Sequence, residues 1–346
     1  MNWSTLFQEL QAAGVRKDAT IPAFPPVRTA TPWVSRVLLG VCGWIAGLLA
    51  LISLGAIVVG MFNNVAMLSA VGVIAIGVAA VLYRTVGRNE LLLQFALATS
   101  IAGQLSLAAA LLDSNRLSST TTALAMAALQ MLLVVIMPNA VHRFLSTLFA
   151  AIALGFAAYK LHAMPILALG LSLATAGVWL SEVRWQCAGF AEWLRPIAYA
   201  LAIALLGLPM ASPETSFWGL GHTPIRADAW SAFAYLPACA LLLWGLVRQA
   251  SGRVQFGATA ACAAMIAVAA YVPGVTVALV VALLGFAAGS VVLVGAALCA
   301  MVAYLGVYYY LLESTLLVKS IALMLSGVGC WVAWGVVRAL NRGVPR

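Results

Sequence analysis

A stretch of 38 residues, from Val275 to Leu312, contains no lysine, arginine, aspartate or glutamate. Similar apolar runs occupy most of the 346-residue chain, which is 64% hydrophobic, 8% charged and has a mean hydropathy of +1.07. Soluble domains carry about 25% charged residues, so this chain cannot cover a water-exposed surface with charge. The composition excludes a soluble enzyme, a nucleic-acid-binding domain and a disordered chain. It predicts an all-α polytopic membrane protein whose main partner is the lipid bilayer.

The apolar runs predict about twelve transmembrane helices. A helix needs about 20 apolar residues to cross the hydrocarbon of a bilayer, because no backbone group can be left unpaired in lipid. Turn-forming or charged residues separate most of the runs, and we divide the 38-residue run at Gly289-Ser290. The fifth, seventh and tenth spans are short, so re-entrant or interfacial segments are an alternative there. The predicted spans are Val37–Met61, Val65–Tyr83, Leu91–Leu112, Ser119–Met137, Phe144–Tyr159, Ala163–Ser181, Pro196–Ala211, Ala229–Val247, Val254–Val272, Val275–Gly289, Val291–Leu312 and Leu316–Val337.

The distribution of basic residues predicts the orientation. With these spans, 14 of the 18 lysines and arginines fall on one side of the membrane and 4 on the other. Basic residues concentrate on the cytoplasmic side of membrane proteins, so we expect both termini in the cytoplasm, as an even number of spans requires. The predicted organisation is an N-terminal segment over residues 1–33, a transmembrane domain over residues 34–338, and a basic cytoplasmic tail over residues 339–346.

The N-terminal segment differs from the rest of the chain. Trp3, Leu6, Phe7 and Leu10 recur at helical spacing, and Gly14 follows as a stop signal. A proline-rich linker then leads to the first span. We predict a short amphipathic helix at the cytoplasmic membrane interface, with a docking site for a soluble partner as the alternative.

Small residues and cysteines inside the spans point to packing. The pairs Gly43/Gly47 and Gly285/Gly289 have the GxxxG spacing of closely packed membrane helices, whether within one chain or between chains. The six cysteines stand singly, without a CxxC or a Cys/His pair at metal-ligand spacing, which predicts buried thiols that act as small hydrophobes. They are Cys42, Cys187, Cys239, Cys262, Cys299 and Cys330. We predict no metal and no cofactor.

Polar residues within the spans are the first candidates for function, because polar groups are costly in a bilayer. No Asp, Glu or His lies near the middle of a predicted span, which argues against a proton-coupled carrier, and we interpret His142 as an interfacial residue. Ser100 and Gln104 share one face of the third span, and Gln130 lies in the next. Interhelical hydrogen bonding is the favoured interpretation of these three side chains, and a polar solute path is the alternative.

The loop from residue 212 to 228 is the second candidate. It faces away from the cytoplasm in the predicted topology and contains Glu214, His222, Arg226 and Asp228. A histidine four residues before an arginine, with carboxylates on either side, could serve as an acid/base pair with an anion-binding group. Trp and Arg also belong at any membrane interface, so catalysis is the less favoured interpretation, with His222 and Arg226 as its candidate residues.

The start of the chain resembles a known family. A helix ending LQAAGV, a proline-rich linker and the segment TPWVSRVLLGVCGWIAGLLAL follow one another, with Trp33, Arg36, Gly40, Gly43 and Trp44 among the matching residues. This arrangement is similar to a family of bacterial polytopic inner-membrane proteins that is described only as a domain of unknown function. Its members are often encoded near proteins with a GDYxxLxY motif. The resemblance implies a bacterial inner-membrane location and assigns no catalytic residues.

Together these features predict a multi-pass, non-enzymatic protein of the bacterial inner membrane. It would be transport-related or a membrane subunit of an assembly, and its partner could be a membrane or periplasmic protein from a neighbouring gene. The alternative is a membrane enzyme that acts on a lipid-linked or glycan substrate through the loop over residues 212–228.

Overall fold

The described part of the chain is helical. The computed structural model describes residues 65–87, 89–113, 118–211 and 273–311, together with positions 38, 41–43, 45–47, 49, 317, 320 and 324, and these contain no strand. The elements are α3 (Val65–Thr85), α4 (Glu90–Asp113), α5 (Ser119–Ile136), α6 (Ala140–Lys160), α7 (Met164–Leu180), α8 (Glu182–Cys187), α9 (Ala191–Gly207), the 3₁₀ turn η1 (Leu208–Ala211), α13 (Pro273–Ala287) and α14 (Val291–Leu311).

Four of these helices, α3 to α6, are long and apolar enough to cross a membrane, and three further apolar helices are shorter. Six predicted spans agree with a described helix to within two residues at each end: α3, α4, α5, α7, α13 and α14. Four predicted spans lie wholly or mainly outside the described residues, as do the N-terminal segment and the C-terminal tail: Val37–Met61, Ala229–Val247, Val254–Val272 and Leu316–Val337. The total of twelve spans and the orientation of the termini therefore stay predictions.

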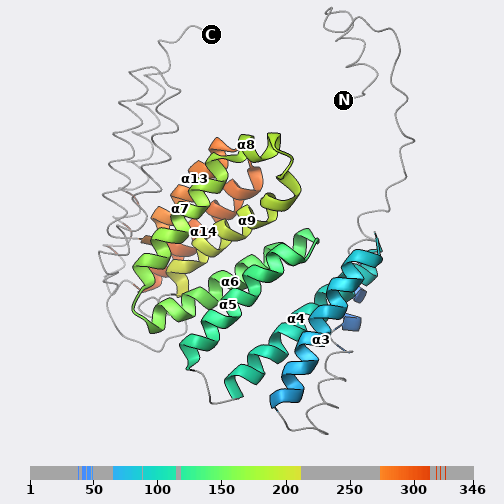
Figure 1. Ribbon diagram of the computed structural model, residues 1–346. Coiled ribbons are helices and arrows are strands. Elements are labelled where there is room, and N and C mark those ends of the chain that lie inside the picture. Colours follow the sequence, from blue (N-terminus) through green and yellow to red (C-terminus); the bar gives the residue numbers. More distant parts are fainter. Residues whose placement is uncertain are drawn as a thin grey trace, which may run out of the picture.

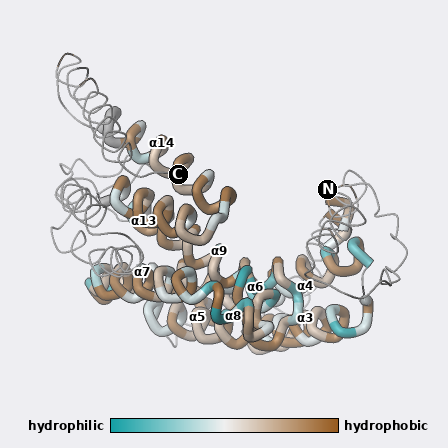
Figure 2. Tube along the Cα trace, turned by 90° about the horizontal axis from the view of Figure 1, so that it is seen from above, coloured by the Kyte–Doolittle hydropathy of each residue, from teal (hydrophilic) through white to brown (hydrophobic). Residues whose placement is uncertain are grey.

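The helices form a row of antiparallel pairs (Figure 1). The pair α3/α4 packs beside α5/α6, α6 packs against α9, and α7 and α9 pack against α13 and α14. The helices are apolar over most of their length, and hydrophilic residues lie at α6, at α8 and at one end of the α3/α4 pair (Figure 2). The rings of Tyr83 and His142 meet edge to face at 5.7 Å, so the end of α3 lies beside the start of α6. Arg84 and Arg143 follow Tyr83 and His142 in the sequence, so these two arginines are at the same end of the bundle.

Two helices begin earlier than the apolar pattern predicts. α6 begins at Ala140 instead of Phe144, because the Asn139 side chain accepts hydrogen bonds from the backbone N–H groups of Val141 and His142 at 2.9 and 3.1 Å. α9 begins at Ala191, five residues before Pro196. A proline removes only one backbone donor and bends a helix without ending it when neighbouring contacts support the helix.

Glycine contacts fix the α3/α4 pair. A Cβ on Gly103 would lie 2.6 Å from the backbone oxygen of Gly72, and one on Gly72 would lie 2.8 Å from that of Gly103. The two backbones therefore touch where the helices cross, which only glycine permits. Gly43 and Gly47 of the first predicted span also face α4: a Cβ on Gly43 would meet the backbone oxygen of Leu91, and one on Gly47 would meet the side chain of Ala98. Their GxxxG contact is thus within one chain.

The second glycine pair has a different role. A Cβ on Gly285 would press against α14, whereas one on Gly289 would meet no atom within 4 Å, and Gly289 has a φ of +63°. The N–H of Ser290 bonds to the oxygen of Gly285, and that of Gly289 bonds to the oxygen of Phe286. This is a Schellman motif, in which a residue with positive φ ends the helix. It confirms the division of the 38-residue run at Gly289-Ser290.

The cysteine prediction is wrong for the described residues. Cys42, Cys187 and Cys299 are free thiols, as expected, but all three are exposed on the outside of the helices. A thiol is weakly polar, so a surface that faces lipid accepts it as readily as the protein interior does. The remaining three cysteines lie outside the described residues.

His162 ends α6 in the left-handed conformation, with a φ of +54°. Its N–H bonds to the oxygen of Tyr159, and the N–H of Ala163 bonds to that of Ala158, so the Schellman motif here lacks its usual glycine. We expect His162→Gly to raise the free energy of unfolding by about 0.5–1 kcal/mol, because glycine adopts positive φ without the steric cost of a Cβ. The measurement is the melting temperature of the purified protein in detergent, with His162→Ala as the control that keeps the Cβ. Equal melting temperatures for the two variants would contradict this explanation.

Candidate functional site

Five buried polar side chains from three helices form one hydrogen-bonded row. They are Gln130 of α5, Ser100 and Gln104 of α4, and His142 and Ser146 of α6. Each is at most 4% exposed. We refer to these five residues as the polar row.

The order of contacts along the polar row is continuous. Gln130 donates from Nε2 to Oε1 of Gln104 at 2.8 Å, and Gln104 donates from Nε2 to Oγ of Ser100 at 3.1 Å. Ser100 Oγ lies 2.8 Å from Nε2 of His142, and Nδ1 of the same ring lies 3.1 Å from Oγ of Ser146. The row thus joins α5 to α4 and α4 to α6.

All the hydrogen bonds of the polar row can point the same way. In a neutral imidazole one nitrogen donates and the other accepts. Ser100 receives the Gln104 N–H, which leaves its own proton to donate to Nε2 of His142, and Nδ1–H then donates to Ser146. Hydrogen bonds aligned in this way polarise one another. Each donor in the row points toward Ser146, and the row begins at an acceptor atom, Oε1 of Gln130, which we call its acceptor end.

The acceptor end of the row is not satisfied. Oε1 of Gln130 is buried and has no hydrogen-bond partner among the described residues, and the same holds for Oγ1 of Thr122 on the same helix. A buried polar atom without a partner costs about 1–3 kcal/mol, and such atoms are rare enough in proteins to need an explanation.

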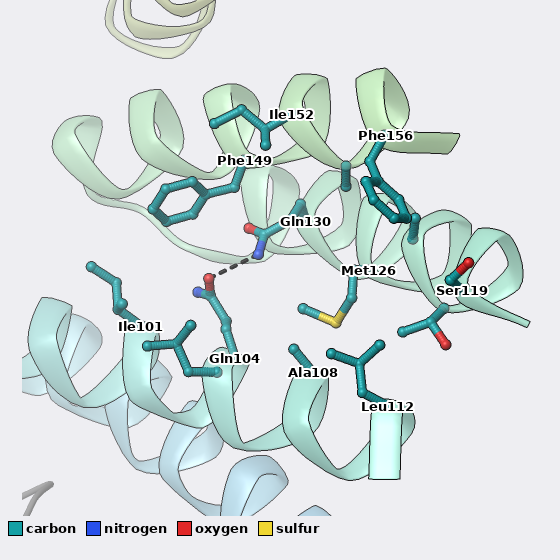
Figure 3. A pocket seen from close by; sticks show the side chains of 14 residues that line it. Ile101, Gln104, Ala108, Leu112, Ser119, Met126, Gln130, Phe149, Ile152 and Phe156 are labelled. Carbon is teal, nitrogen blue, oxygen red and sulfur yellow. Dashed lines mark hydrogen bonds between the residues drawn. The ribbon is translucent and has the colours of Figure 1, made fainter. Parts of the chain in front are cut away.

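Gln130 and Thr122, whose two unmet oxygen atoms are themselves buried, also line a cavity. Its volume is about 480 Å³, and it is lined by α4, α5 and α6. Figure 3 shows the amides of Gln104 and Gln130 meeting at one side of it, with Met126 nearby and Phe149, Ile152 and Phe156 forming the wall from α6. Apart from Gln104, Gln130, Thr122 and Ser119, the lining is apolar, and none of the residues that line it is charged. Cavities of this size with few polar groups are typical of small-molecule sites.

The structure brings together the polar residues that the sequence singles out. Ser100, Gln104 and Gln130 are direct neighbours in the polar row, and the bond between the two glutamines joins two helices. This geometry is compatible with both interpretations of the three residues, structural bonding and a solute path.

His142, Ser146 and Thr122 are members of the site that sequence reasoning missed. His142 is 1% exposed and contacts Ser100 of α4, so its side chain lies between the helices, while its interfacial depth in the membrane stays a prediction. The available signal was spacing: His142 and Ser146 are four residues apart on one helical face, as are Ser100 and Gln104.

The second candidate site lies outside the described residues. Glu214, His222, Arg226 and Asp228 belong to the segment over residues 212–272, so the enzyme alternative stays a prediction. Among the described residues, no group of three or more His, Cys, Asp or Glu side chains could hold a metal ion.

A family model matches most of the chain. It is described as "Domain of unknown function (DUF4401)" and covers residues 32–339. No curated protein and no solved structure matches the chain. The match confirms the resemblance to a family of unknown function, whereas bacterial origin and the neighbouring genes stay predictions.

Proposed function

The chain belongs to the DUF4401 family, and we propose that it is a transport-related multi-pass protein of a bacterial cytoplasmic membrane. In this proposal the polar row forms part of the path of a small uncharged solute. The observation that carries the proposal is that the row ends at a cavity with an unmet acceptor, Oε1 of Gln130. A row that served only to hold helices together would gain stability by satisfying that atom.

The chemistry of the row favours an uncharged solute. Its amides, hydroxyls and imidazole supply hydrogen-bond donors and acceptors but no fixed charge, and none of the residues that line the cavity is charged. An ion inside a bilayer needs a counter-charge or several convergent dipoles. A solute with hydroxyl or amide groups instead exchanges its bonds to water for bonds to the row.

The test is flux into proteoliposomes that contain the full chain. We expect protein-dependent uptake of at least one of glycerol, urea and ribose, followed by light scattering after an osmotic step. Gln104→Leu and Gln130→Leu should lower that rate about tenfold, since losing one buried hydrogen bond to the solute costs about 1.4 kcal/mol. The matched control is Gln186→Leu on α8, where the exposed amide contacts only Glu182.

Two outcomes would overturn the proposal. One is the absence of protein-dependent flux for all three solutes. The other is flux that neither substitution in the polar row changes. Co-purification of a stoichiometric partner from membranes, together with absent flux, would favour the assembly role instead.

A further inference from the structure

We infer that the cavity between α4, α5 and α6 is a binding site for an uncharged, elongated amphiphile that enters from the bilayer and carries a hydroxyl at each end. This goes beyond the proposed function, because it concerns a ligand from the membrane and holds whether or not a solute crosses.

The opening of the cavity indicates where the ligand comes from. Leu105, Leu112, Ile152 and Phe156 belong both to the lining of the cavity and to the exposed surface of the helices. All four lie in helices that are long and apolar enough to cross a membrane. An apolar rim at this position admits the hydrocarbon of a lipid-soluble molecule directly from the bilayer.

The two unmet oxygen atoms indicate what the ligand carries. Oε1 of Gln130 can only accept, so the ligand needs a hydrogen-bond donor there. The bond from that donor would precede the bond from Gln130 to Gln104 and extend the aligned series of the polar row by one. Oγ1 of Thr122 can donate or accept. Satisfying both atoms removes two buried unpaired groups, which gives a hydroxylated ligand an advantage over a purely apolar one.

The spacing of these two residues indicates the length of the ligand. Thr122 and Gln130 are eight residues apart on α5, which places them on similar faces and about 12 Å apart along the helix axis. Met126 and Ala123 of α5 line the cavity between them, and Phe156 of α6 lies on the same side of Gln130 as Met126 (Figure 3). The ligand therefore has an apolar middle that lies against these side chains and a polar group at either end.

The absence of charge in the lining excludes the ionic lipids as preferred ligands. A phosphate or carboxylate would enter a cavity whose lining offers no lysine or arginine, and burying such a group without a partner is costly. A hydroxyl needs only the bonds that Gln130 and Thr122 offer.

The test is photo-crosslinking of the full chain in lipid nanodiscs. The probe is a long-chain α,ω-diol whose extended length matches the separation of Thr122 and Gln130, with a diazirine at the middle of the chain. The comparison probe is its dimethyl ether, which has the same chain but no donor. We expect the diol to label the helical segments around Met126 and Phe156, and the ether to label them about tenfold less, as expected for the loss of one buried hydrogen bond.

Three variants make the test specific. Gln130→Leu should reduce diol labelling to the level of the ether. Thr122→Val, which keeps the side-chain shape and leaves the polar row intact, should reduce it severalfold. Thr120→Val, the same change two residues away and outside the cavity lining, should leave it unchanged.

Equal labelling by diol and ether would show that only hydrocarbon occupies the cavity and would overturn the inference. Unchanged labelling in both Gln130→Leu and Thr122→Val would do the same. Because Gln130→Leu also removes a bond to Gln104, Thr122→Val keeps the inference testable if Gln130→Leu fails to fold. Neither result depends on flux, so this inference and the proposed function can fail separately.

Discussion

Replacing Gly103 by leucine is expected to separate α3 from α4 and to lower the free energy of unfolding by roughly 3 kcal/mol, at the upper end of the usual cost of overpacking. The leucine side chain would clash with the backbone of α3, because a Cβ at position 103 would lie 2.6 Å from the backbone oxygen of Gly72. A flexible side chain could move aside, whereas a helix backbone can yield only by moving the whole helix. The measurement is the melting temperature of the detergent-solubilised protein, followed by size-exclusion chromatography after heating.

Gly77→Leu is the matched control for this substitution. Gly77 lies on the neighbouring helix α3, and a Cβ placed there meets no atom within 4 Å. The same change should therefore leave the melting temperature unchanged or raise it, since leucine is a better helix former than glycine. A similar loss of stability in the Gly77 and Gly103 variants would mean that backbone contact is not what holds α3 and α4 together.

Replacing His142 by leucine is expected to cost about 2 kcal/mol, because it leaves two buried serine hydroxyls without their ring partner. Ser100 would keep the bond from Gln104, and Ser146 would lose the bond to Nδ1. The substitution also removes the contact between α4 and α6 at the centre of the polar row. The measurement is the same melting experiment, with Thr147→Val as the control, since the Thr147 hydroxyl donates to the backbone oxygen of Arg143 in its own helix.

A double-mutant cycle isolates the bond between His142 and Ser100. If the 2.8 Å contact is a real hydrogen bond, the cost of His142→Leu should be smaller in a Ser100→Ala background, with a coupling energy of about 0.5–1.5 kcal/mol. Strictly additive costs would mean that the two side chains are neighbours without being bonded.

The helices could be predicted because their signals are local. Apolar runs of membrane-spanning length, interrupted by turn formers, are sufficient to place α3, α4, α5, α7, α13 and α14. The division at Gly289-Ser290 succeeded for the same reason: a glycine with positive φ ends α13 through bonds to residues within the preceding turn and a half. Short-range patterns failed at α6, where Asn139 caps a helix whose first turn is polar.

The candidate site could be predicted only in part. Ser100, Gln104 and Gln130 stand out because they are polar residues in apolar runs. His142 does not, because it lies at the start of α6, and its burial depends on Ser100, 42 residues earlier in the chain. Thr122 stands among neighbouring threonines and serines at the start of α5, and only the cavity distinguishes it from them.

By itself the sequence predicted a membrane protein and placed six of the described helices to within two residues at each end, because a helix satisfies its backbone bonds within four residues and needs only a sufficient apolar length. The tertiary structure alone decided which polar side chains meet and that Gln130 and Thr122 border a cavity with unmet bonds. The physical reason is that side-chain partners lie on different helices, so their pairing depends on how the helices pack, and small residues such as Gly72 and Gly103 set that packing.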